Sequence, residues 1–115
     1  MYAEQQQSGI LAFLEAEFEN CLMSGADFYN MNLEQASFSN TNLSGSLFTD
    51  SNMSGSRFTN LNLTHSLLGD LRLTGSRMIG CDLSGVDIKH CNTEGLTIDG
   101  IPLQELLAAY NKMNA

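Results

Sequence analysis

A period of five residues runs through most of this chain and restricts its fold more than any other feature. Taking every position whose number ends in 3 or 8, from Phe18 to Ile98, selects seventeen residues, of which sixteen are large and apolar. Thr93 is the exception. A fixed internal repeat of this kind indicates a repeat architecture, in which each unit contacts only its neighbours in a regular stack.

A second column of small residues lies two positions before each centre. It holds Ala, Ser, Thr or Cys in most units, as at Ala26 and Ser46, and a larger residue such as Leu61 in a few. All fourteen charged residues between Ala16 and Gly100 fall in the other three columns. The central column and the small column are therefore both predicted to be buried.

Neither a straight helix nor a straight strand can bury residues that are five apart. In an α-helix, such residues lie about 140° from one another around the axis. In a strand, an odd spacing points successive centres to opposite faces of the sheet. Each unit must therefore bend, and eight of the ten glycines lie two residues after a centre, where they alternate mainly with Asn and Asp. These residue types tolerate turn conformations.

Two units that show the full pattern are Ala26-Asp27-Phe28-Tyr29-Asn30 and Thr41-Asn42-Leu43-Ser44-Gly45. The pattern resembles the pentapeptide-repeat family, whose signature is A(D/N)LXX with a central Leu or Phe. Seventeen units, over residues 16–100, run in unbroken register, although Ser often replaces Ala. The resemblance implies an all-β solenoid, a right-handed quadrilateral β-helix of about four coils with four units per coil, in which residues twenty apart stack.

Phenylalanine has a second period, of ten residues, from Phe18 to Phe58. Ten residues make half a coil in this geometry, so Phe is predicted to line two opposite walls, with Leu and Met on the other two. The predicted structural core comprises Phe18, Phe28, Phe38, Phe48, Phe58, Leu33, Leu43, Leu63, Leu73 and Leu83.

Both open ends of such a rod are sheet edges that need covering. Residues 1–15, which include Ile10, Leu11, Phe13 and Leu14, are predicted to form an N-terminal cap before the β-helix of residues 16–100. Gly100 and Pro102 break the repeat, and a capping α-helix is predicted within residues 101–115. The apolar stripe of that helix, the predicted end cap, is Leu103, Leu106, Leu107 and Tyr110.

The formal net charge of −8 disfavours direct binding to nucleic acid or to an anionic membrane. The apolar run from Ile10 to Leu14 is too short for a signal core or a membrane span. Cys21, Cys81 and Cys91 match no CxxC spacing and are interpreted as reduced thiols. We therefore expect a cytoplasmic protein.

The outward columns contain few reactive groups, so no enzyme activity, metal site or cofactor is predicted. His65 and His90 are one corner and one coil apart, without an obvious set of further ligands. Asp50, Asp70 and His90 stack in one column, which predicts a contact between Asp70 and His90 as a structural surface pair. No Ser or Cys nucleophile is placed beside His90.

One wall of the predicted rod combines carboxylates with outward Leu and Tyr side chains. It is centred on Phe28, Phe48, Leu68 and Ile88 and carries one cation, Lys89. The opposite wall has Arg57 and Arg77 stacked one coil apart, and the other two walls are mostly Ser, Thr and Asn. Stacked exposed leucines can mark a contact site, although scattered ones are normal on any protein surface. The candidate interaction face comprises Asp27, Tyr29, Leu47, Asp50, Leu67, Asp70 and Asp87.

These features favour a non-enzymatic protein-interaction or scaffold module whose protein partner the sequence does not identify. The family resemblance implies an alternative, a DNA mimic that binds DNA gyrase or another type II topoisomerase and gives quinolone resistance. The acidic charge fits that role, but four coils make a rod of about 20 Å, shorter than one 34 Å turn of B-DNA. Mimicry would therefore require an end-to-end homodimer. Family members dimerise through C-terminal elements, whereas the single stripe here is expected to be used by capping, so monomer and homodimer are both considered.

Overall fold

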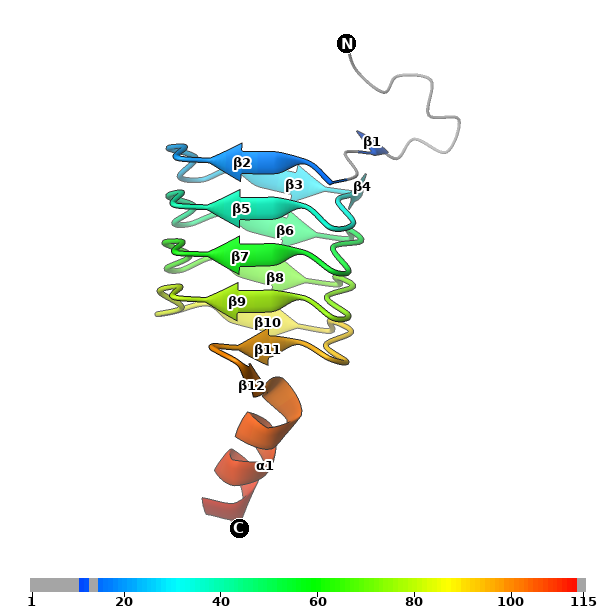
Figure 1. Ribbon diagram of the computed structural model, residues 1–115, viewed down its shortest axis with the longest axis vertical. Helices are drawn as coiled ribbons and strands as arrows, with labels where there is room; N and C mark the ends of the chain where they lie inside the picture. The colour runs from blue at the N-terminus through cyan, green and yellow to red at the C-terminus, as the bar shows by residue number, and fades with distance from the viewer. Residues whose placement is uncertain (1–10, 13–14, 114–115) are drawn as a thin grey trace.

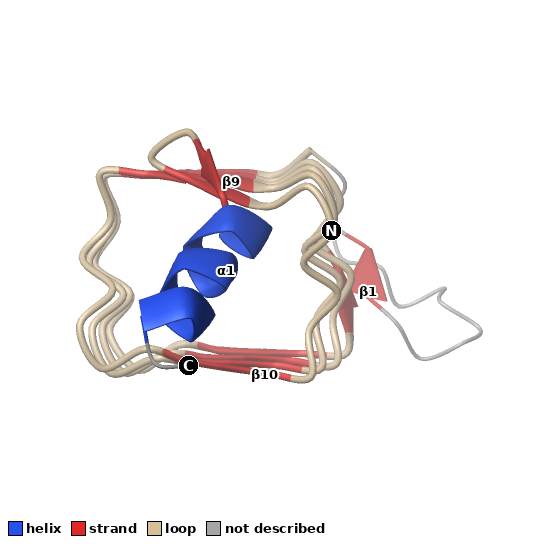
Figure 2. Cartoon of the chain, turned by 90° about the horizontal axis from the view of Figure 1, so that it is seen from below, coloured by secondary structure: helices blue, strands red, loops and turns tan. Residues whose placement is uncertain are grey.

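The computed structural model describes residues 11–12 and 15–113, and it shows a four-sided β-helix followed by one α-helix (Figure 1). Viewed along the rod, the stacked coils share one four-sided outline (Figure 2). The parallel pairings join residues twenty apart, such as Phe18 with Phe38 and Phe38 with Phe58. The predicted fold class, with four units per coil, is therefore confirmed.

Two opposite walls carry the regular strands, and we name them walls A and C. Wall A is a sheet in the order β12-β11-β9-β7-β5-β2, and wall C is a sheet in the order β10-β8-β6-β3. The strands of wall A are β2 (Glu17–Glu19), β5 (Ser37–Ser39), β7 (Arg57–Thr59), β9 (Arg77–Ile79), β11 (Thr97–Ile98) and β12 (Ile101–Pro102). The strands of wall C are β3 (Asp27–Tyr29), β6 (Leu47–Thr49), β8 (Leu67–Gly69) and β10 (Asp87–Lys89).

The other two walls, B and D, are held mainly by single β-bridges, because the chain turns immediately after the centre of each unit. In wall B, for example, the amide of Ser46 donates to the carbonyl of Leu43 and closes a tight turn. At the start of wall D, β4 (Met31–Asn32) pairs with β1 (Leu11–Ala12). The bridged residues are Leu22, Asn42, Asn62 and Asp82 in wall B, and Asn32, Asn52, Arg72 and Asn92 in wall D.

Asparagine before the centre of a unit supports these turns. The Oδ1 atom of Asn42 accepts a hydrogen bond of 3.0 Å from the amide of Ser44, and Asn62 does the same for Thr64. Such local side-chain bonds explain why Asn and Asp recur at this outward position. The main role of the bridged asparagines in walls B and D is therefore to support the turns.

The core is a ladder of phenylalanine rings. On wall C, Phe28 and Phe48 stack at 4.6 Å with an interplanar angle of 7°, and on wall A, Phe18 and Phe38 stack at 4.7 Å and 10°. Rings from the two walls meet edge to face across the interior, as Phe28 and Phe38 do at 5.9 Å and 90°. Both geometries are favourable for aromatic pairs. The prediction that Phe lines two opposite walls is confirmed.

Eight of the ten residues in the predicted core are buried, and two are only partly buried. The exceptions, Phe18 and Leu83, lie in the first and last coils, where fewer neighbours cover a side chain. The small column contains more than space-filling residues. The buried hydroxyl of Ser66 donates to the carbonyl of Leu43 at 2.8 Å and accepts from the amide of Ser46 at 3.1 Å, so it bridges two coils.

The predicted N-terminal cap lies largely outside the described residues. Of its residues, Leu11 belongs to β1, which extends the first coil by pairing with β4. Ile10, Phe13 and Leu14 are outside the part of the chain that the structure describes.

At the other end, α1 (Leu103–Met113) matches the predicted helix but does not bury the predicted stripe. Leu103 packs against the core, whereas Leu106, Leu107 and Tyr110 are exposed by 37%, 50% and 64%. The helix begins directly after β12, with no loop to fold it back, so it points away from the last coil (Figure 1). The last coil is instead closed by Leu96, which is fully buried and whose carbonyl accepts from the amide of Leu103.

Removing one rung of the ring ladder should destabilise the whole rod. We expect Phe38→Ala to lower the free energy of unfolding by about 3–5 kcal/mol, because a fully buried ring in contact with four others leaves a cavity. Urea denaturation followed by circular dichroism measures the change. Ser39→Ala, the neighbouring outward residue, is the control and should cost almost nothing. Equal losses at the two positions would contradict the inward and outward assignment.

Candidate interaction surface

Wall C presents two outward rows of side chains that run along the rod. One row is Asp27, Leu47, Leu67 and Asp87, which the strand register places side by side. The other row is Tyr29, Thr49, Gly69 and Lys89. The structure thus brings five of the seven predicted face residues onto one sheet, with leucine in the middle and aspartate at both ends of the first row.

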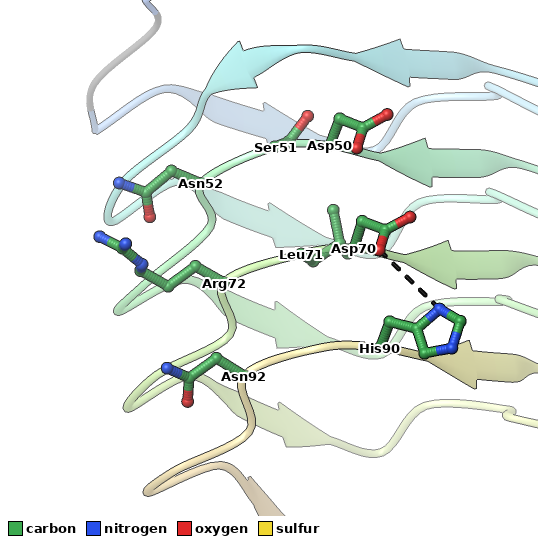
Figure 3. Close-up of a pocket in the computed structure, with 8 residues that line it drawn as sticks. All are labelled: Asp50, Ser51, Asn52, Asp70, Leu71, Arg72, His90 and Asn92. Carbon is green, nitrogen blue, oxygen red and sulfur yellow. Dashed lines mark ion pairs between the residues drawn. The ribbon is translucent and has the colours of Figure 1, made fainter.

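The remaining two predicted residues, Asp50 and Asp70, lie at the corner where wall C turns into wall D (Figure 3). Both have a left-handed backbone, with φ of 53° and 52°, which Asp and Asn adopt more readily than most residues. His90 continues the column, and its Nδ1 atom lies 3.9 Å from the Oδ1 atom of Asp70. The predicted contact between Asp70 and His90 is therefore present, as a long and exposed one.

The two leucines of the wall differ in exposure. Leu47 is 42% exposed, whereas Leu67, which we expected to be exposed as well, is half-buried. The reason lies in the neighbouring row: a Cβ atom at Gly69 would be 3.9 Å from the Cγ atom of Leu67. Leu67 therefore leans over the space that Gly69 leaves, and Tyr29, at 63% exposed, is the most prominent apolar side chain of the wall.

The charge on wall C is only partly neutralised within the chain. Lys89 pairs with Asp87 at 3.3 Å, but both side chains are more than half exposed, so the pair contributes less than about 1 kcal/mol. Among the described residues, neither Asp27 nor Asp50 forms an ion pair. The negative charge of the surface is therefore concentrated towards β3 and along the corner.

An open groove of about 570 Å³ follows this corner (Figure 3). The column of Asp50, Asp70 and His90 forms one side of it. The other side contains Arg72 between two asparagines, a row that the sequence analysis did not single out. The row could have been found from the sequence, because successive members of the series Asn52, Arg72 and Asn92 are twenty residues apart. The corner between walls A and B has a similar groove lined mainly by asparagines. A groove of this shape is therefore a feature of the coil corners, and the groove beside Asp50 and Asp70 differs from it in its charged side chains.

A second exposed apolar surface is the stripe of α1, and the two surfaces are separate. Leu107 is half exposed and Met113 is 84% exposed, and Ile101 adds a further 44% exposed side chain beside the helix. Between α1 and the last coil lies a cleft of about 340 Å³, lined by Ile88, His90, Cys91, Thr93, Leu103 and Leu107. The helix therefore stands over the open end without packing tightly on it (Figure 2).

The described residues include two histidines and three cysteines. Neither His65 nor His90 hydrogen-bonds to a Ser, Thr or Cys side chain, and no three His, Cys, Asp or Glu residues within residues 15–113 could share a metal ion. The three cysteines are free. Burial raises the pKa of the Cys81 and Cys91 thiols, which donate to the carbonyls of Phe58 and Leu68. A thiol held protonated in this way is a poor nucleophile.

In the part of the chain that the structure describes, no helix has both the length and the apolar character needed to cross a membrane. On wall A, Arg57 and Arg77 are register neighbours, as predicted.

The sequence matches a family model described as a pentapeptide repeat region, over residues 11–88. The chain belongs to the pentapeptide-repeat family. A search of curated proteins returned no match. Among solved structures, it is similar to the pentapeptide-repeat protein HetL of the cyanobacterium Nostoc sp. strain PCC 7120, involved in heterocyst differentiation regulation, with 16% identity and a TM-score of 0.53. The match covers 76% of this chain and 49% of HetL.

This pentapeptide-repeat protein is also similar to QnrB1, a plasmid-mediated fluoroquinolone resistance protein, with 18% identity and a TM-score of 0.51. That match covers 76% of this chain and 48% of QnrB1. The chain therefore spans about half the length of these two solved structures. At such low identity, the likeness establishes the shared coil architecture alone.

The partly buried thiols of Cys81 and Cys91 make stability sensitive to alkaline pH. Their folded-state pKa values are raised, so their contribution is fully present below about pH 8.5 and is lost as pH rises, because the unfolded thiols ionise first. We expect the unfolding free energy of the wild type to fall more between pH 7.5 and pH 9.5 than that of Cys81→Ser/Cys91→Ser. Urea denaturation at the two pH values measures both. An equal fall in the two proteins would refute this assignment.

Proposed function

We propose that this pentapeptide-repeat protein is a non-enzymatic protein-interaction module, and that wall C with its Asp50 and Asp70 corner is the surface that binds the partner. The observation that carries the proposal is the register of the wall, which places Leu47 and Leu67 together between carboxylates. A patch with an apolar centre and a polar rim is the usual arrangement of a protein-binding surface.

The composition of the other walls supports this choice. The outward Asn residues of walls B and D are engaged in turn hydrogen bonds, as Asn52 is with the amide of Ser54. Wall A carries two stacked arginines, and its exposed apolar residues Ile79 and Ile101 lie on different strands, β9 and β12, without flanking carboxylates in their own strands. We place the protein in a reducing compartment such as the cytoplasm, which suits its three free cysteines.

Site-specific photocrosslinking in the native host tests the surface directly. A photoreactive phenylalanine derivative at Leu47 should give a discrete crosslink to a second polypeptide, because this residue lies at the centre of the proposed interface. The matched control is Ile79, an apolar residue of similar exposure on wall A. Identical products from both positions, or none from Leu47, would contradict the proposal.

A second candidate function is binding to DNA gyrase or another type II topoisomerase as a DNA-mimicking, end-to-end homodimer. The observation in its favour is the stripe of α1, because Leu106 and Leu107 are exposed rather than used by capping. A second copy that packs the same stripe against it would bury these residues around a two-fold axis. It would also lengthen the acidic rod, which a single copy of four coils leaves shorter than one turn of B-DNA.

The dimer and its activity can be tested together. Light scattering should give twice the 12.6 kDa monomer mass for the wild type. Leu107→Glu should give the monomer, because a charge would be buried in the contact between stripes. Ala108→Glu adds the same charge on the opposite side of the helix and should leave the dimer intact. In a supercoiling assay with purified gyrase, the dimer should inhibit at low salt and less at moderate salt, since the attraction is electrostatic.

Two outcomes would contradict this second candidate. A wild type that is strictly monomeric at tens of micromolar would exclude the end-to-end dimer. Gyrase inhibition by Leu107→Glu equal to that by the wild type would exclude the need for dimerisation.

A further inference from the structure

The partner of wall C can be described more closely from the shape and charge of the wall. We infer that the wall binds a basic amphipathic α-helix of the partner protein, laid along the axis of the rod. This inference rests on the proposed function of wall C as the interaction surface. It specifies the chemistry and secondary structure of the segment that the wall accepts.

The spacing of the wall favours a helix over an extended segment. Leu47 and Leu67 are register neighbours on adjacent parallel strands, so they are about 4.8 Å apart along the rod. Successive turns of an α-helix rise by about 5.4 Å, so its side chains at i and i+3 or i+4 can contact both leucines in turn. In an extended strand, side chains on the same face are about 6.7 Å apart. This spacing exceeds the distance of about 4.8 Å between coils, so the side chains of a strand fall out of step with the leucines within two coils.

The shape of the outer surface of wall C also favours a helix. Leu67 leans over Gly69, and Leu47 has the short side chain of Thr49 beside it in the second row, so the middle of the wall is shallow and mostly apolar. Tyr29 stands higher at the β3 end. A helix lying beside Tyr29 could bury this ring together with both leucines.

The charges select a basic helix. Asp50 and Asp70 form a row at the corner that follows Thr49 and Gly69 (Figure 3), and Asp27 lies at the β3 end of the row of leucines. Asp27 and Asp50 form no ion pair within the described chain, whereas Asp87 at the far end is paired with Lys89. Lys or Arg residues of the helix are therefore expected on the flank that faces Asp50 and Asp70, and at the end that faces Asp27.

Synthetic peptides provide the probe. The first is a helical 16-residue peptide with Leu along one face and Lys on both flanks, labelled for fluorescence anisotropy. The second carries Glu in place of every Lys, and the third has the composition of the first with two central prolines that prevent helix formation. We expect the first peptide to bind the wild type in low salt at least tenfold more tightly than the second and the third, with an increase in helical circular dichroism on binding.

Matched variants locate the site on the rod. Asp50→Asn/Asp70→Asn should weaken binding of the first peptide at least tenfold, and Asn suits these turns, because Asn30 occupies the same column. Asp82→Asn/Glu94→Gln removes the same charge from walls B and D and should change binding less than twofold. Leu47→Ser should weaken binding at least fivefold, whereas Ile79→Ser on wall A should not.

Each other outcome overturns the inference. Equal loss in the two charge variants would mean that the peptide responds only to net charge. Tighter binding of the proline peptide would mean that the wall accepts an extended segment. Absence of binding by the first peptide would exclude a basic helix as occupant, while a crosslink from Leu47 but not from Ile79 in the native host would still support the wall as an interaction surface.

Discussion

The stacking of each coil on the one before it is the interaction on which the rest of the structure depends. A single coil has few contacts of its own, because its strands are three residues long and pair only with strands twenty residues away. The stack supplies the backbone hydrogen bonds, the ring ladder of walls A and C, and the serine hydroxyls that join one coil to the next. Stability of this kind is a property of neighbouring repeats together, since no coil can bury its apolar side chains alone.

The same register organises the surface. Because residues twenty apart are neighbours, an outward residue type that recurs at that interval becomes a continuous row on the rod. The rows of walls B and D support the turns, while wall C combines leucine with carboxylates, of which Asp87 pairs with Lys89 and Asp27 forms no ion pair with a described residue. The backbone of wall C is already held by strand pairing before any partner arrives, so binding to it requires little ordering of the rod itself. That property suits the interaction module that we propose.

The C-terminal end follows different rules from the coils. The antiparallel pairing of β12 with β11 covers the edge of wall A, and Leu96 with Leu103 closes the interior. The apolar stripe of α1 beyond Leu103 is largely exposed and gives the molecule a second apolar surface, distinct from wall C. The two surfaces support two different functional proposals, one through a heterologous partner on the wall and one through a second copy at the end.

The sequence by itself determined that every unit bends, because residues five apart cannot all face inward from a straight helix or strand. The coil of four units came from the resemblance to the pentapeptide-repeat family. With four units per coil, counting residues placed Phe28 and Phe38 on opposite walls and brought Asp70 and His90 together. Only the tertiary structure decided how deeply individual side chains are buried, because that depends on contacts that the five-residue period does not specify. Leu67 is half-buried because Gly69 beside it leaves room. Leu106 and Leu107 are exposed because α1 starts directly after β12, with no loop to fold it back. Periodicity specifies which way a side chain points, but its burial depends on what the neighbouring coil or the end of the chain places over it.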